Sequence, residues 1–500
     1  MENLRERALF GLGWSGATQA LGQVLQFAIS IILARVLSPR EFGLIGMILV
    51  FTAFASSLSD MRLGAALIQK RAVSDRHLNS VFWLNVGVGS SLTLLFCLTA
   101  PLVANFYHEP LLRLLTIAVA INFVLNSLTV VHTALLDKSL SFRARFWIEI
   151  VATFFSGIVA LTLAFNGAGV WSLVGQSLTA AVIRIALMWR SHQWRPGTSF
   201  DLSALKDLMH FGGPLFGSSI VAYWGRNFDK LVIGRLIGSS ALGIYNLADR
   251  LMRLPLTNVT DVTTAVMFPA LSLMQDDVES VRRVYLRATG MIALLTFPMM
   301  IGLSVAAEPA ILVVYGDQWR EAIGIVQLLC FAGMAQSVYN TATWIFLSRG
   351  RTDTFFRLIV YTTLVRVAGV FVGVHWGITG VAWAYVLGGY VLLWYPTWSA
   401  VGRLLHLRVG ELLKNVAGPL GCAAAMGVLV WSVDWWLLAG QAAWIRLILQ
   451  TVMGTFVYCF FIRRFRLKAW DETRSLILEI GGRRRRFIRW LLQDNDRAGS

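Results

Sequence analysis

Charged residues and cysteines are scarce in this sequence. Asp, Glu, Lys and Arg make up 14% of its 500 residues and hydrophobic residues 56%, whereas a soluble domain carries about 25% charged residues. So little charge cannot cover so much apolar surface, which excludes a soluble enzyme and a disordered chain. The apolar residues suffice for roughly fourteen helices of about 20 residues, the length that crosses a bilayer. The composition therefore predicts an all-α polytopic membrane protein.

Motifs for disulfide, metal, nucleotide and nucleophile chemistry are also missing. The four cysteines, Cys97, Cys330, Cys422 and Cys459, stand apart in apolar runs, and we expect them to be small buried hydrophobes. The sequence has no GxxxxGK[ST] loop, which argues against a nucleotide-driven pump, and it has no HExxH or serine-elbow motif. No cofactor is predicted.

Apolar runs between charged residues, glycines and prolines predict fourteen membrane-spanning helices. Strands are implausible because the runs are continuous, and a backbone in lipid must satisfy its hydrogen bonds within its own segment. The predicted spans are 9–34, 41–60, 78–104, 112–136, 146–165, 169–189, 208–237, 242–271, 285–307, 322–347, 355–375, 378–402, 412–433 and 443–462.

The basic residues predict the orientation of the chain. With the N-terminus placed in the cytoplasm, 32 of the 44 Lys and Arg residues fall on the inner side, 6 in outer connections and 6 within spans. This bias follows the positive-inside rule and predicts that both termini are cytoplasmic. The net charge of +17 therefore indicates membrane topology, and no nucleic-acid partner is expected.

An internal repeat predicts two six-helix lobes in parallel orientation. The stretch LARVLSPREFGLI is echoed two hundred residues later by IGRLIGSSALGIY, which aligns Arg35 with Arg235 and Gly43 with Gly243. Repeated halves of transporters usually bind substrate at their interface near mid-membrane. The predicted parts are an N-terminal lobe at 1–200, a C-terminal lobe at 201–408, two extra helices at 409–465 and a basic cytoplasmic tail at 466–500, which either binds anionic lipid or only sets the topology.

Charges inside predicted spans are the main candidates for a binding site, because such charges are costly unless they face a partner or a wet cavity. The seventh and eighth spans carry them at matching distances from their turn: Arg226, Asp229 and Lys230, then Asp249, Arg250 and Arg253, with Asp261 deeper. The acids either form ion pairs that hold the two helices in register or take part in transport. The excess of cations favours an anionic ligand. Arg366 and Arg184 can add to the same site, although Arg184 could equally reach the inner surface. Glu149 is the only mid-span acid of the first half.

An amide stripe marks the first span. Gln19, Gln23 and Gln26 lie on one helical face. Amide stripes commonly join helices in membranes, but amides also suit sugar hydroxyl groups. We favour a cavity wall that faces a sugar.

Four further stretches are distinctive: NFDKLVIGRLIGSSALGIYNLADRLMRLP from Asn227, FPALSLMQDD from Phe268, AALIQKRAVSDRHLNSVFWLN from Ala65 and AGVWSLVGQ from Ala168. Together they resemble the polysaccharide-transport family of oligosaccharide flippases, the Wzx-like proteins. That family belongs to the multidrug, oligosaccharidyl-lipid and polysaccharide exporter superfamily.

The resemblance implies two six-helix lobes plus two helices, in the bacterial cytoplasmic membrane. The implied activity moves polyprenyl-pyrophosphate-linked oligosaccharide units from the inner to the outer leaflet for lipopolysaccharide or exopolysaccharide biosynthesis, by alternating access without an ATPase of its own. The expected roles are pyrophosphate binding by Arg226, Lys230, Arg250, Arg253 and Arg366, glycan contact by Gln19, Gln23 and Gln26, and H⁺ or Na⁺ coupling by Asp249, Asp261 or Asp229. The expected partners are this lipid-linked oligosaccharide, membrane lipids and other polysaccharide-assembly proteins.

Two other functions remain open. A cation-coupled multidrug exporter of the same superfamily would favour acids and aromatic residues for cationic drugs, and here bases dominate. A membrane polymerase or ligase of lipid-linked glycans would need a sizeable outer loop with catalytic residues. The longest outer connection, around 308–321, has only about 14 residues, so the flippase is ranked first.

Overall fold

The predicted all-α class is confirmed. A computed structural model describes residues 2–59, 67, 73–201, 213–438, 440–465, 467 and 470, and every regular element in these ranges is a helix. The chain forms two compact units. Unit 1 comprises Met1–Asn246, Val314–Trp319 and Val370–Ile378, and unit 2 comprises Leu247–Val313, Arg320–Gly369 and Thr379–Ser500.

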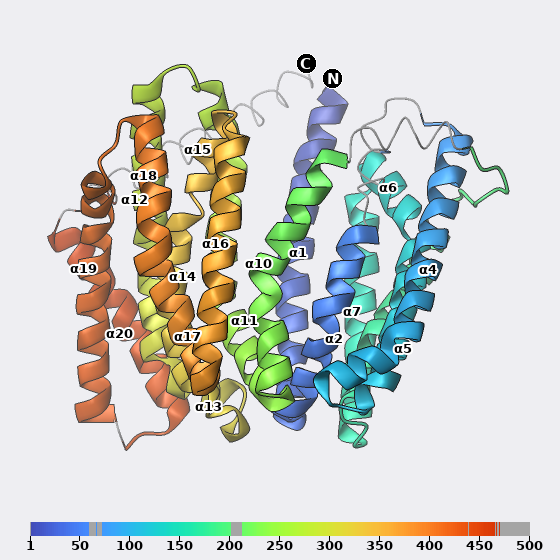
Figure 1. Ribbon diagram of the computed structural model, residues 1–500, viewed down its shortest axis with the longest axis horizontal. Helices are drawn as coiled ribbons and strands as arrows, with labels where there is room; N and C mark the ends of the chain where they lie inside the picture. Colours follow the sequence, from blue (N-terminus) through green and yellow to red (C-terminus); the bar gives the residue numbers. More distant parts are fainter. Residues whose placement is uncertain are drawn as a thin grey trace, which may run out of the picture. The chain divides into compact units, whose positions relative to one another are not determined.

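Unit 1 is built from long helices that pack in pairs along their length (Figure 1). They are α1 (Glu2–Val36), α2 (Pro39–Ser59), α4 (Asp75–Tyr107), α5 (Leu111–Ser127), α6 (Val130–Lys138), α7 (Phe142–Phe165), α8 (Trp171–Ser191), α10 (Gly213–Leu236) and the start of α11 (Ser239–Leu273), with short turns η1 (Asp317–Trp319) and η2 (Val374–Trp376). The closest pairs are α4 with α5, α7 with α8 and α1 with α7. Ile29 and Leu33 of α1 are buried against Ala160 of α7. Gly157 allows this approach, because a Cβ there would lie 2.3 Å from Ile29 Cδ1.

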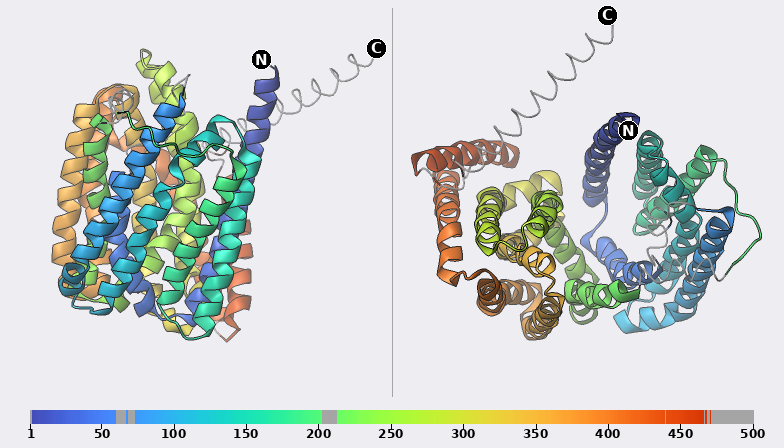
Figure 2. Two further views of the ribbon diagram at one scale, coloured as in Figure 1. Left: turned by 90° about the vertical axis from the view of Figure 1, so that its right-hand side faces the viewer. Right: turned by 90° about the horizontal axis from the view of Figure 1, so that it is seen from above.

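Unit 2 is organised around α12. Its helices are the rest of α11, α12 (Val278–Val305), most of α13 (Ala307–Val314), α14 (Ala322–Tyr339), α15 (Ala342–Ser348), most of α16 (Thr352–Gly373), most of α17 (Gly377–Leu387), the π-helix η3 (Gly388–Leu393), α18 (Trp394–Leu405), α19 (Val409–Val433), the π-helix η4 (Asp434–Leu438) and α20 (Ala443–Arg464). α12 contacts α14, α18, α19 and α20. The two last helices, α19 and α20, lie at the edge of unit 2 (Figure 2).

All fourteen predicted spans lie mainly on helices where the chain is described, although turns interrupt three of them at residues 128–129, 306 and 340–341. Fourteen crossings are not confirmed. By length and hydropathy, ten helices of the described residues could cross a membrane, or eleven if the bent pair α5 and α6 is one span. Two features account for the difference. The charged helices α10 and α11 are not in this count, and the helical stretch Thr352–Leu405 counts once although it covers two predicted spans.

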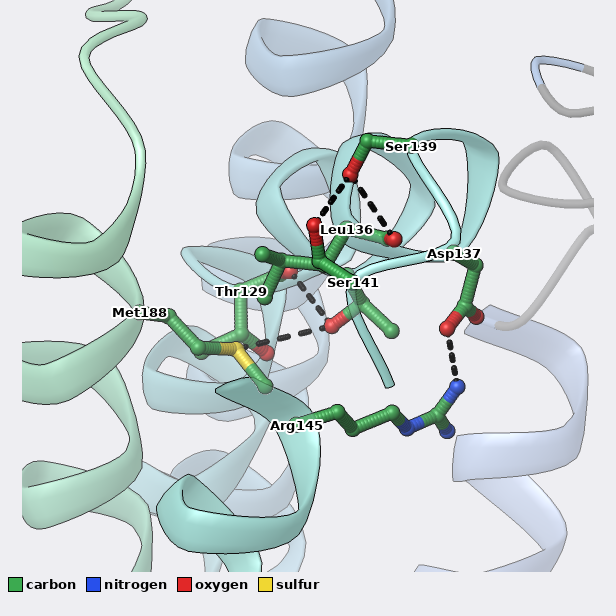
Figure 3. Close-up of polar contacts among 8 residues, drawn as sticks. Thr129, Leu136, Asp137, Ser139, Ser141, Arg145 and Met188 are labelled. Carbon is green, nitrogen blue, oxygen red and sulfur yellow. Dashed lines mark hydrogen bonds and ion pairs between the residues drawn. The ribbon is translucent and has the colours of Figure 1, made fainter. Parts of the chain in front are cut away.

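The α6–α7 turn shows how polar side chains close a helix end (Figure 3). Ser139 Oγ donates to the carbonyl of Leu136 at 3.0 Å and lies 2.9 Å from Ser141 Oγ. Arg145 forms an ion pair with Asp137 across the turn. The Leu136 carbonyl also accepts from the backbone N–H of Ser141 at 3.0 Å, so Ser139 adds a second hydrogen bond to the last turn of α6, and the ion pair links α6 to α7.

The two copies of the repeat meet inside unit 1. A Cβ on Gly43 would lie 1.7 Å from the carbonyl oxygen of Ser239, and a Cβ on Gly243 would lie 1.9 Å from that of Pro39. The start of α2 therefore touches the start of α11 backbone to backbone, and the two contacts mirror each other. Only glycine leaves room for this approach. The division into lobes at residues 200 and 408 stays a prediction.

The cysteine prediction was wrong at one position. Cys330 and Cys422 are buried and Cys97 is half-buried, but Cys459 is exposed on α20. Phe456 and Phe460 are also exposed on that helix, as expected where apolar side chains face lipid. Apart from residues 467 and 470, the predicted basic tail at 466–500 lies outside the described residues.

Candidate functional site

The charges predicted in the seventh span lie on α10, which packs against α2 in unit 1. Arg226 is exposed and Lys230, one turn further along the same face, is half-buried. Asp229 is only 6% exposed. Its carboxylate accepts hydrogen bonds from the Tyr245 hydroxyl at 2.7 Å and from the backbone N–H of Lys230 at 2.8 Å. Asp229 is thus an internal, hydrogen-bonded acid beside two cations.

The charges predicted in the eighth span lie on the part of α11 that belongs to unit 2. Asp249 is buried and Arg250 is exposed. Arg253 Nε lies 2.8 Å from Asp249 Oδ1, one helical turn away, and the two side chains are 28% and 7% exposed. This ion pair holds the Arg253 guanidinium in one orientation. The side chain of Asp261 lies outside the described residues.

The two charged groups therefore belong to different compact units. Arg226, Asp229 and Lys230 lie in unit 1, whereas Asp249, Arg250 and Arg253 lie in unit 2. Their convergence on one cationic layer stays a prediction.

The predicted glycan-facing stripe is accessible. Gln19, Gln23 and Gln26 are all exposed on α1. The buried residues Ile29 and Leu33 of the same helix pack on α7 instead. The amides are therefore available to a ligand rather than used in the core of unit 1.

Arg184 has a partner that the sequence did not reveal. Its Nε lies 3.2 Å from Glu149 Oε2, which joins α8 to α7, and each side chain is 30% exposed. The sequence does contain a signal for this pair. Glu149 and Arg184 lie 18 and 17 residues from Gly167 in the turn between α7 and α8, so the two side chains lie at similar distances from that turn. Arg184 is therefore engaged within unit 1 rather than simply directed at the inner surface.

Arg366 on α16 lines a pocket of unit 2. Its guanidinium carbon lies 5.3 Å from the ring centroid of Tyr385 on α17. Gln336 and Tyr339 of α14 and Trp394 of α18 complete the polar and aromatic wall. The enclosed space is about 20 Å³, enough for about one water-sized group. Sequence reasoning found Arg366 but none of these four neighbours, because aromatic and amide residues in spans carry no signal of their own.

Comparisons with known proteins agree with this architecture. Residues 32–324 match the family described as "Polysaccharide biosynthesis protein". The teichuronic acid biosynthesis protein TuaB of Bacillus subtilis is 29% identical over 96% of this chain and 99% of its own length. The lipopolysaccharide biosynthesis protein WzxC of Escherichia coli is 28% identical over 74% of this chain and 76% of its own length.

A solved structure shares the fold. The lipid II flippase MurJ, in an inward closed conformation, superposes with a TM-score of 0.71 over 93% of this chain and 100% of that chain, at 16% identity. The chain therefore shares the fold of that protein. The chain belongs to the polysaccharide biosynthesis protein family whose model it matches.

Proposed function

We propose that this protein is a flippase for lipid-linked oligosaccharides. It moves polyprenyl-pyrophosphate-linked units from the inner to the outer leaflet of the bacterial inner membrane for surface polysaccharide biosynthesis, with both termini in the cytoplasm. The observation that carries the proposal is the family membership, together with the match to TuaB over nearly the full length of both chains. The fold shared with a lipid II flippase is consistent with it.

The physical barrier to this reaction explains the intramembrane charges. A pyrophosphate and many hydroxyl groups cannot cross hydrocarbon unassisted, because each would lose its hydrogen bonds to water. Fixed cations in a wet path replace those bonds with charge-assisted ones. In this proposal Arg226, Lys230, Arg250 and Arg253 hold the pyrophosphate. The isoprenoid tail stays in lipid.

The remaining polar residues take supporting roles. Gln19, Gln23 and Gln26, which are exposed on α1, contact sugar hydroxyls. Asp249 positions Arg253 through their 2.8 Å contact, and a proton on Asp249 would weaken this ion pair. This link makes Asp249 the coupling residue we favour over Asp229 for H⁺.

Removal of cations on α11 tests the cationic site. In the Arg250→Gln/Arg253→Gln variant, polysaccharide export should cease and lipid-linked oligosaccharide should accumulate on the inner leaflet, while the protein remains in the membrane. The matched control is Arg283→Gln/Arg357→Gln, which removes two exposed arginines and should export normally. Normal export by the α11 variant would refute the cationic site.

Deletion of the gene separates the three functions. Accumulation of the lipid-linked unit on the inner leaflet supports the flippase. Accumulation on the outer leaflet would instead support a polymerase or ligase, and drug sensitivity with intact surface glycan would support a multidrug exporter.

Arg250→Gln alone provides a milder test of the cationic site if the double substitution lowers the amount of protein, because it leaves the Asp249–Arg253 pair intact.

A further inference from the structure

The surroundings of Arg366 differ from those of Arg253 and Arg184, two other arginines within predicted spans. Arg253 lies against Asp249 and Arg184 against Glu149, whereas Arg366 lies over the Tyr385 ring. Arg366 makes no ion pair or hydrogen bond to any other residue that the structure describes. Its guanidinium can therefore donate hydrogen bonds to a ligand without first losing a carboxylate.

An acceptor lies in the same wall. Gln336 lines the pocket, and its side-chain oxygen Oε1 is buried without a hydrogen-bond partner among the described residues. A buried amide oxygen without a partner is unfavourable, so a group that donates a hydrogen bond to it would be stabilised. The pocket thus combines a strong donor, Arg366, with an unsatisfied acceptor.

A π-helix shapes the aromatic side of the pocket. Residues five apart in an α-helix lie about 140° apart around its axis, whereas π-helical bonding joins residues five apart. The π-helix Gly388–Leu393 therefore brings Gly389 and Trp394 to the same side, and both line the pocket. π-Helical turns are frequent at functional sites.

The wall is also held firmly. Trp394 stacks on Trp398 with ring centroids 4.2 Å apart, and Trp398 is only 1% exposed. Tyr390 donates its hydroxyl hydrogen to the carbonyl of Phe331 at 2.8 Å, which fastens the π-helix to α14. Such a preorganised wall costs little ordering entropy when a ligand binds.

We propose that this pocket is a saccharide subsite, which rests on the proposed flippase function and refines it. A sugar hydroxyl is at once acceptor and donor, so one hydroxyl can accept from Arg366 and donate to Gln336 Oε1. The space of about 20 Å³ admits one such oxygen, while the sugar ring lies at the mouth against the aromatic side chains. A phosphate oxygen fits less well, because it cannot donate to Gln336 Oε1 and would be repelled by it. Arg366 is thereby assigned to the glycan rather than to the pyrophosphate.

Direct binding to the purified full-length protein distinguishes the two assignments. The probes are undecaprenyl pyrophosphate without sugar and the free oligosaccharide repeat released from the polysaccharide of the source bacterium. Arg366→Gln and Gln336→Leu should each weaken oligosaccharide binding at least tenfold and change pyrophosphate binding less than twofold. Arg357→Gln, at an exposed position of the same helix, is the matched control and should change neither.

The outcomes separate the subsite from the flippase function. Weaker pyrophosphate binding with unchanged oligosaccharide binding would overturn the subsite and leave the flippase proposal standing. Wild-type protein that binds the pyrophosphate but no oligosaccharide would also overturn the subsite and leave the flippase proposal standing. Wild-type protein that binds neither probe would overturn the flippase proposal itself. If Arg366→Gln does not fold, Gln336→Leu carries the test.

Discussion

The two repeat turns, Leu37–Ser38 between α1 and α2 and Ile237–Gly238 between α10 and α11, share their backbone contact but not their polar contacts. Gly43 and Gly243 meet reciprocal backbone atoms. Ser38 donates its backbone N–H and its hydroxyl to Glu41 at 2.6 and 2.9 Å. The second turn instead contains Gly238, whose φ of +116° is a backbone conformation that favours glycine.

The aligned arginines also differ in what they contact. Arg35 Nε donates to the carbonyl of Val314 at 3.0 Å, whereas Arg235 lies against the ring of His108 and over that of Phe106. Each arginine reaches a segment from the other half of the sequence. Close backbone packing therefore requires glycine at both turns, whereas the hydrogen bonds differ from one turn to the other.

The largest expected effect comes from filling the shared contact. Gly43→Ala and Gly243→Ala should each destabilise the protein by about 3 kcal/mol, the upper end of ordinary overpacking, because the added Cβ meets backbone rather than a side chain that can rotate away. Thermal unfolding in detergent measures this. Gly22→Ala is the control, because nothing lies within 4 Å of a Cβ there, and its effect should be neutral or stabilising. Equal unfolding temperatures for the three variants would show that the backbone contact between the two turns does not require glycine.

Trp319→Phe should weaken the first turn alone. The fully buried Trp319 donates its ring N–H to the carbonyl of Ala34 at 2.7 Å and packs edge to face on Phe42. Losing that bond and part of the ring should cost about 1 to 2 kcal/mol, read from the same unfolding midpoint. Trp376→Phe, at a side chain 71% exposed, should cost little. A large loss in both variants would indicate a general tryptophan effect.

Glu109→Ala should loosen both turns slightly. Its carboxylate accepts from Arg40 Nη2 at 3.0 Å and from Ser239 Oγ at 2.9 Å, so it links one residue near each turn. We expect a cost of about 1 kcal/mol. In double-mutant cycles the coupling with Arg40 should be below about 1 kcal/mol, since Arg40 is 61% exposed and exposed ion pairs contribute little. A stronger coupling would show that the bridge depends mainly on charge.

Arg235→Gln should have the smallest effect, about 0.5 kcal/mol, because the contacts that it loses with His108 and Phe106 lie at an exposed surface. Arg35→Gln should cost more, since it removes a hydrogen bond to a backbone carbonyl. Unfolding midpoints of the two variants, measured side by side, check the order. The reverse order would mean that the contacts of Arg235 with His108 and Phe106 contribute more than those of Arg35.

Several features were predictable because their causes are local in the chain. Continuous apolar runs predict helices since a backbone in lipid must bond to itself, and all fourteen stretches lie mainly on helices where described. The echo of Gly43 by Gly243 indicated an internal repeat, and the structure shows that both positions need glycine. The resemblance to oligosaccharide flippases is confirmed by the family match over residues 32–324.

Side-chain pairing was not predictable to the same degree. Spacing alone allowed Arg184 to point to a binding site or to the membrane surface, and the packing of α7 against α8 pairs it with Glu149. The exposure of Cys459 likewise depends on which face of α20 packs against the other helices of unit 2. Helix rotation about its axis decides such contacts, and apolar composition does not reveal that rotation when a helix is hydrophobic on most sides.

Composition and local pattern are thus sufficient for the membrane environment, the helices and the repeat, because hydrophobicity and backbone hydrogen bonding act within each segment. The residues around Arg366, by contrast, are brought together only by the tertiary packing of unit 2. Gln336, Tyr385 and Trp394 come from three helices, and a π-helical turn alters the register between two of the lining positions. Neither the packing of separate helices nor a local change of helical period leaves a readable mark in the chain, so the chemistry of this pocket emerges only when the helices pack together.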